Sequence, residues 1–167
     1  MAREYTLSSA GITLANQAVT LAFLNPAAGP SSTIEIYHCW ASQSANATSA
    51  QQRVQLVTQV TAFPTLTSAT PAKLNLGDPV SAITGGTAGA AGTSGINASA
   101  EGAGTKTIRW EEAFNVLNGF LWGPWPVGHS NVIRLRAGEA SGFGLHFPVA
   151  AATLTNWAFG IAFREIG

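Results

Sequence analysis

Apolar and polar residues alternate in short runs along this chain, which is the two-residue period of a β-strand. In one such run, Ile34 and Ile36 fall on one face and Glu35 on the other. Runs of this kind occupy residues 4–8, 12–24, 31–44, 53–60, 73–76, 105–110, 131–136, 143–147 and 157–164. Gly, Pro, Asn and Ser separate them. The pattern predicts an all-β fold over residues 1–167, a single antiparallel β-sandwich, jelly-roll-like, with about eight or nine short strands.

Two segments compete with this interpretation as helices, residues 47–52 and 111–117. Both are shorter than most helices, and neither carries an apolar stripe with a period of 3.6 residues. The sequence therefore favours strands throughout.

Residues 77–104 differ from the rest of the chain because they contain eight glycines and few large apolar side chains after Val80 and Ile83. A structureless loop of this length is uncommon in a compact domain and is usually functional or disordered. Two interpretations follow. The segment is either a flexible surface loop or an extended Gly/Ala-rich arm that becomes ordered against a neighbouring subunit, since small residues let two backbones approach closely.

The composition points to protein partners. Only 10% of the 167 residues are charged, and eight basic residues balance eight acidic ones. A chain without net charge lacks the basic surface of a sequence-independent nucleic-acid binder, so we expect no nucleic-acid partner. A neutral, charge-poor surface promotes association. We therefore expect other chains, including copies of this one, to cover much of it.

The start of the chain and its cysteine indicate where the protein is made. No signal peptide follows Met1, and no apolar run approaches the roughly 20 residues that span a bilayer, so we expect no membrane partner. The single cysteine, Cys39, has no second cysteine with which to form an internal disulfide. Both features are typical of a protein synthesised in a reducing cytoplasm.

Catalytic patterns are scarce in this sequence. His38 and Cys39 are neighbours on a strand, so their side chains point to opposite faces and do not form a nucleophile–base pair. Glu111 and Glu112 are the only adjacent carboxylates, and His146 lies in an alternating apolar run typical of a hydrogen-bonded structural histidine. We expect no catalytic residues, no metal site and no cofactor, and hence not an enzyme.

The tryptophans give a stronger signal. Trp122 and Trp125 stand beside Gly123, Pro124 and Pro126, which predicts a rigid turn or the end of an edge strand. Exposed indoles at such a turn would bind a sugar ring or a pocket on a partner protein. Buried indoles there would close the end of the core. By contrast, Trp110 and Trp157 lie in regular alternating runs and are predicted to be core residues.

The C-terminal half of the chain resembles a family of small proteins encoded among the structural genes of tailed bacteriophages. The similarity is carried by residues 108–116, by the run Gly-Phe-Leu-Trp-Gly-Pro-Trp-Pro at residues 119–126, and by residues 132–135 and 163–165. Shorter similarities lie at residues 2–7 and 34–36. The resemblance implies a virion protein with a β-sandwich, possibly jelly-roll, fold that decorates or cements a capsid or forms part of a head or tail surface.

These observations lead to a working hypothesis. The chain is expected to be a non-enzymatic virion protein on the capsid surface, a decoration (cement) or minor capsid protein that forms a homotrimer and contacts the major capsid protein. The residues expected to contact partners are Ala2, Arg3, Glu4, Tyr5, Gly85, Gly86, Gly89, Gly92, Gly95, Ile96, Trp122 and Trp125. Two alternatives remain open: a carbohydrate- or receptor-binding head module of a phage fibre, and a major subunit that forms a shell or tube.

Overall fold

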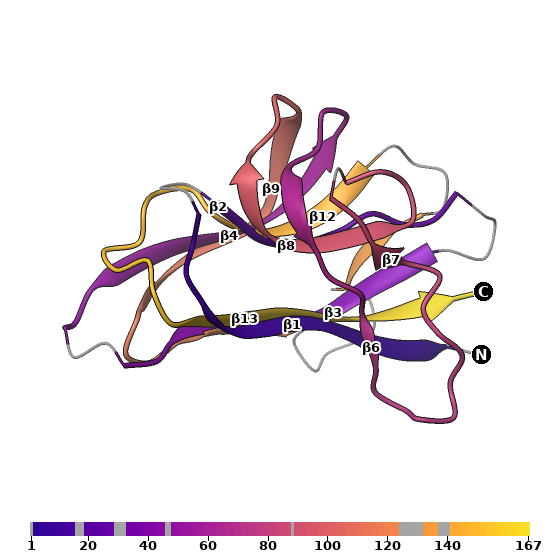
Figure 1. Ribbon diagram of the computed structural model, residues 1–167, viewed down its shortest axis with the longest axis horizontal. Helices are drawn as coiled ribbons and strands as arrows, with labels where there is room; N and C mark the ends of the chain where they lie inside the picture. The colour runs from indigo at the N-terminus through magenta and orange to yellow at the C-terminus, as the bar shows by residue number, and fades with distance from the viewer. Residues whose placement is uncertain are drawn as a thin grey trace.

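The computed structural model of the protein describes residues 2–15, 19–28, 33–45, 48–87, 89–123, 132–136 and 141–167. Within them the chain forms thirteen strands and no helix, in two sheets packed face to face (Figure 1). Sheet A contains β1 (Arg3–Ile12), β3 (Thr33–Gln43), β6 (Ala72–Lys73), β10 (Phe120–Trp122), β11 (Ile133–Leu135) and β13 (Trp157–Ile166). Sheet B contains β2 (Val19–Leu24), β4 (Gln51–Val60), β5 (Thr65–Ser68), β7 (Thr84–Gly85), β8 (Thr93–Ala100), β9 (Thr105–Asn115) and β12 (Ser141–Phe147).

The order of the strands is that of a jelly roll. Sheet A runs β10-β3-β13-β1, with β11 also beside β3, and sheet B contains the run β2-β12-β4-β9. The first strand pairs with the last and β2 pairs with β12, so the two halves of the chain are nested antiparallel to each other. The predicted antiparallel sandwich is confirmed. Thirteen strands exceed the expected eight or nine because the chain between β4 and β9 adds four more.

The core lies between the two sheets, where their inward-facing side chains meet. Trp157 on β13 is fully buried and packs edge-on against Phe147, with ring centroids 4.9 Å apart, and against Phe114 at 6.4 Å. Its indole N–H donates a hydrogen bond to the carbonyl of Thr153 at 2.9 Å. A buried indole needs such a partner. The prediction that Trp157 is a core residue is confirmed.

The glycine-rich segment corrects a sequence-based expectation. Its residues 93–100 form β8, which pairs with β2 on one side and with β5 on the other. A Cβ at Gly95 would lie 2.6 Å from the Leu66 Cβ and 2.8 Å from the carbonyl oxygen of Thr67. The expectation of a long loop or arm is therefore wrong for β8, because its small residues let β5 approach within this chain's own sheet.

Two further expectations change, whereas the preference for a strand over a helix at residues 111–117 is confirmed as far as Asn115, where β9 ends. The predicted strand 12–24 is divided, since β1 ends at Ile12 and β2 begins at Val19. Trp110, expected in the core, is 40% exposed. The reason is that β9 lies at the end of sheet B, where there is no further strand to cover it among the described residues.

Candidate interaction site

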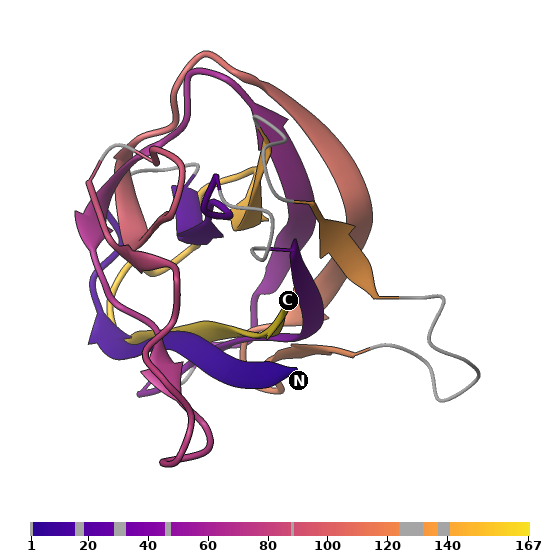
Figure 2. The same ribbon diagram turned by 90° about the vertical axis from the view of Figure 1, so that its right-hand side faces the viewer.

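β9 is the longest strand at any sheet end within the described residues. It has 11 residues and pairs with β4 on one side, and no described strand pairs with its other side (the salmon ribbon on the right of Figure 2). The strands at the other sheet ends, β5, β6, β10 and β11, have two to four residues. Short edge strands discourage unwanted pairing. At about 3.4 Å per residue, β9 instead presents unpaired backbone groups over roughly 35 Å.

A β-bulge interrupts β9 at Arg109. Consecutive residues of β4 lie opposite Ile108 and Trp110, which leaves Arg109 as the extra residue. Bulges redirect side chains, and the Arg109 Nε donates a hydrogen bond to Thr58 Oγ1 at 2.9 Å. Ile108 is 49% exposed and Trp110 is 40% exposed. Large apolar groups on both faces of this edge are therefore in contact with solvent.

The charges on β9 are separated along the strand. Lys106 and Arg109 lie in its first half, and Glu111 and Glu112 lie in its second half. Glu111 accepts a hydrogen bond from Arg53 Nε at 2.9 Å, which holds the pKa of that carboxyl below its usual value. Within the described part of the chain, Arg109 and Glu112 form no ion pair.

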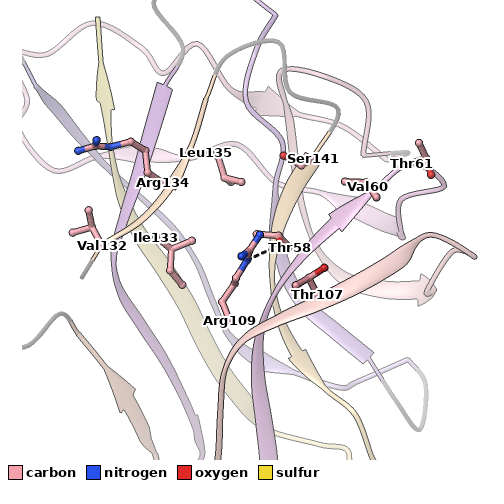
Figure 3. A pocket seen from close by; sticks show the side chains of 10 residues that line it. All are labelled: Thr58, Val60, Thr61, Thr107, Arg109, Val132, Ile133, Arg134, Leu135 and Ser141. Carbon is pink, nitrogen blue, oxygen red and sulfur yellow. Dashed lines mark hydrogen bonds between the residues drawn. The ribbon is translucent and has the colours of Figure 1, made fainter. Parts of the chain in front are cut away.

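A cavity of about 730 Å³ lies beside β9 at the open flank of the sandwich (Figure 3). Its walls come from β4, β9 and β12 of sheet B and from β11 of sheet A. Ile133 and Leu135 supply apolar surface, and Thr107 and Arg109 supply polar groups. A strand added to the free edge of β9 would direct alternate side chains toward the inner side of the sheet, where this amphipathic cavity lies.

A second charged cluster, centred on Glu35, lies across sheet A. Arg164 Nε and Arg134 Nε donate hydrogen bonds to the two Glu35 oxygens at 2.5 Å and 2.8 Å, and Arg134 points away from the cavity in Figure 3. Burial raises the pKa of Glu35, but the two arginine hydrogen bonds outweigh it and the pKa is lowered. The cluster links β3, β11 and β13, and its charges are compensated within the chain, so it has a structural role.

Glu101 connects the turn between β8 and β9 to β2 through hydrogen bonds. Its carboxylate accepts hydrogen bonds from the Thr20 backbone N–H at 2.6 Å and hydroxyl at 2.7 Å, and lies 3.1 Å from Lys106 Nζ. His146 Nδ1 lies 3.3 Å from the Thr20 hydroxyl and 3.4 Å from Glu101. Burial lowers the pKa of His146, and the Glu101 carboxylate partly opposes this effect. The expectation that His146 is a hydrogen-bonded structural residue is confirmed.

The N-terminal residues expected to contact partners lead into or lie on β1: Ala2, Arg3, Glu4 and Tyr5. Tyr5 is fully buried, with its ring 5.6 Å from that of Phe163, and its hydroxyl donates a hydrogen bond to the carbonyl of Pro79 at 3.1 Å. Arg3 lies 3.6 Å from the buried Glu165 carboxylate. Tyr5 therefore belongs to this chain's own core, whereas Ala2 is exposed.

The expected contact residues of the glycine-rich segment belong to the folded insertion between β4 and β9: Gly85, Gly86, Gly89, Gly92, Gly95 and Ile96. Gly89 and Gly92 have positive φ angles of 59° and 75°, a region that glycine adopts easily. A Cβ at Gly86 would lie 2.6 Å from the Thr93 Cβ. Ile96 is 9% exposed. Gly86, Gly95 and Ile96 thus make close contacts within the chain.

Of the two tryptophans in the proline-containing turn, the structure places only Trp122. Trp122 lies on β10 opposite Cys39 and is 8% exposed, so the structure favours the core-closing interpretation for this residue. Trp125 lies outside the described residues.

Of the surfaces described above, the β9 edge was not expected from the sequence, because Ile108 and Trp110 alternate as they would in a buried strand.

No family model matches the chain, and neither a curated protein nor a solved structure is significantly similar to it. Among the described residues, no helix has the length and hydropathy that a membrane span requires. In the same residues, no group of three or more His, Cys, Asp or Glu side chains is placed to hold a metal ion.

Proposed function

We propose that the chain is a non-enzymatic structural protein of a tailed-bacteriophage virion that decorates or cements the capsid through protein–protein contacts. The observation that carries this proposal is the free edge of β9, where unpaired backbone groups lie next to exposed Ile108 and Trp110. The jelly-roll order supports it, because this architecture includes viral capsid domains as well as lectins. Fold class alone assigns no function, so the argument depends on the edge.

The mechanism is burial of this edge by a strand of a neighbouring chain on the capsid surface. Backbone hydrogen bonds along β9 would provide affinity, and the cavity beside it would select the partner's side chains. A stable interface removes about 800 Å² per partner from water. Apolar area contributes about 25 cal/mol per Å² before the entropy of association is subtracted. Repetition over a shell adds avidity, so modest individual contacts are sufficient.

The proposal is tested by co-sedimentation with shells assembled from the capsid proteins of the same virus without this chain. We expect saturable binding that is lost in the Ile108→Asp variant. Leu76→Asp is the matched control, because Leu76 is 93% exposed in a turn remote in sequence from β9. Absence of binding by the unaltered chain at any concentration would overturn the capsid role.

Trp40 favours a second candidate, carbohydrate recognition. Trp40 lies opposite Gly160 in sheet A and is partly exposed. Three atoms of its six-membered ring occupy the space that a Cβ on Gly160 would need, so the ring covers the glycine with one face. An indole held in this way can stack its other face on a sugar ring. Glycan-dependent fluorescence quenching that disappears in Trp40→Ala would support this function, and a glycan panel without any quenching would contradict it.

A further inference from the structure

We infer that β9 pairs with β9 of a second copy of this chain, antiparallel, so that two sandwiches share one continuous sheet B. The inference rests on the proposed function in treating β9 as a contact surface. It names the strand that buries β9 as that of a second copy, which leaves the contact with the shell to other surfaces of the dimer. A contact of this kind uses the same edge on both copies, so pairing consumes both edges and the assembly closes as a dimer.

The order of charges on β9 favours an antiparallel copy of the same strand. Because Lys106 and Arg109 precede Glu111 and Glu112, reversing one copy sets each basic half against an acidic half. A parallel copy would place like charges side by side, which is destabilising. Arg109 and Glu112, which have no ion-pair partner within the described residues, are brought together in the antiparallel arrangement. By symmetry this contact forms twice.

Arg109 and Glu112 also lie on the same face of sheet B. Glu112 is opposite Val54, which belongs to the core, and residues directly opposite in a sheet share a face. Arg109 reaches the hydroxyl of Thr58, four residues further along β4 and on the same face as Val54. The bulge is what turns Arg109 to this side. The two charges are therefore on the correct face to meet across a shared sheet.

Apolar area and net charge favour the same partner. Ile108 and Trp110, near the middle of β9, would lie against the partner strand and lose part of their exposure of 49% and 40%. The chain has no net charge, so no long-range repulsion opposes the approach of a second copy. The predicted assembly is a pair, in place of the trimer expected from the sequence.

The test is a charge exchange read out by sedimentation velocity over a range of concentrations. The unaltered chain should form a species of about 34 kDa, twice the chain mass of 17.2 kDa. Arg109→Glu and Glu112→Arg each place like charges at both symmetric contacts. Each should raise the dissociation constant of the dimer by about tenfold or more. Lys73→Glu, an exposed reversal on β6, is the control and should change nothing.

The decisive step is to mix the two variants in equal amounts. Opposite charges then face each other at both contacts of the mixed pair, so dimers should return with an affinity near that of the unaltered chain. The double variant in one chain should recover in the same way. Thermal unfolding of each variant verifies that a loss of dimer is not a loss of fold.

Several outcomes would overturn the inference: a monomer at every concentration, a trimer of about 52 kDa, or a dimer that both variants leave unchanged. Its failure is distinguishable from failure of the capsid role. A chain that binds shells while remaining monomeric contradicts self-pairing and leaves the proposed function standing. Dimers that respond to the charge exchange but ignore shells support self-pairing and contradict the capsid role.

Discussion

β8 and β9 follow each other in the chain, joined by residues 101–104, yet they occupy opposite environments. β8 reads Thr-Ser-Gly-Ile-Asn-Ala-Ser-Ala, a composition typical of a loop, and it is an interior strand of sheet B. β9 contains Ile108, Trp110 and Phe114, a composition typical of a core strand, and it is the exposed edge of the same sheet. The difference teaches that a strand's neighbours, more than its own side chains, decide how deeply it is buried.

The contacts of β8 show how small residues become interior. β2, β5 and β7 all pair with it, and Gly95 allows β5 to approach. Asn97 has a positive φ of 50°, a conformation that asparagine tolerates better than most residues. Its side-chain amide donates to the carbonyl of Thr13 at 2.9 Å and its oxygen accepts from the Ala15 N–H at 3.0 Å. β9 has neighbours on one side only, so Ile108 and Trp110 remain exposed, whereas Phe114 near its end is buried in the core.

The largest effect is expected from removing β8. Replacing residues 93–100 with a Gly-Ser linker of equal length should abolish cooperative unfolding, because β2 and β5 lose a common neighbour. The control replaces residues 74–78, an exposed turn, with the same linker and should keep the transition. The measurement is thermal unfolding followed by circular dichroism. A cooperative transition in the first variant would restore the interpretation of this segment as a separable arm.

The next comparison is between Trp157 and Trp110, which both lie in runs of alternating apolar and polar residues. Trp157→Ala should lower the free energy of unfolding by about 3–5 kcal/mol, since the indole is fully buried. Trp110→Ala should cost less than about 1.5 kcal/mol, because 40% of that residue is already exposed. Urea unfolding measures both variants. Equal losses would contradict the different burial of the two positions.

A smaller effect separates the isoleucines of the two strands. Ile96 on β8 is 9% exposed and Ile108 on β9 is 49% exposed. Ile96→Ala should cost about 2–4 kcal/mol, whereas Ile108→Ala should change the stability of the monomer by about 0.5 kcal/mol or less. Because both variants replace an isoleucine with alanine, each one serves as the control for the other. A greater loss at Ile108 would mean that the edge is covered within the monomer.

The smallest effect concerns the turn that joins the two strands. Burial lowers the pKa of His146 in the folded state, so the unfolded chain binds more protons below its ordinary pKa of about 6.5. The free energy of unfolding should therefore fall as pH decreases below about 6.5, by at most about 1.4 kcal/mol per pH unit for one proton. His146→Gln should reduce this slope. An unchanged slope would show that His146 does not cause the pH dependence.

Much of the fold could be predicted from local patterns. The alternation of apolar and polar residues identified the sandwich, the core position of Trp157 and the structural role of His146. It could do so because every second side chain of a strand points to the same face, whatever the strand's neighbours. The edge could not be predicted in this way. Trp110 and Trp157 both lie in alternating runs, but the strand of Trp157 has a neighbouring strand on each side, whereas the strand of Trp110 has one described neighbour only.

The sequence by itself determined the class of the protein: an all-β chain with balanced charge and with basic residues preceding acidic ones in the segment that becomes β9. Those properties are local or compositional, so they need no knowledge of distant contacts. Only the tertiary structure decided that β8 is interior, that β9 ends its sheet and that Arg109 turns inward at a bulge. Each depends on pairing between residues far apart in the chain, and burial is set by that pairing.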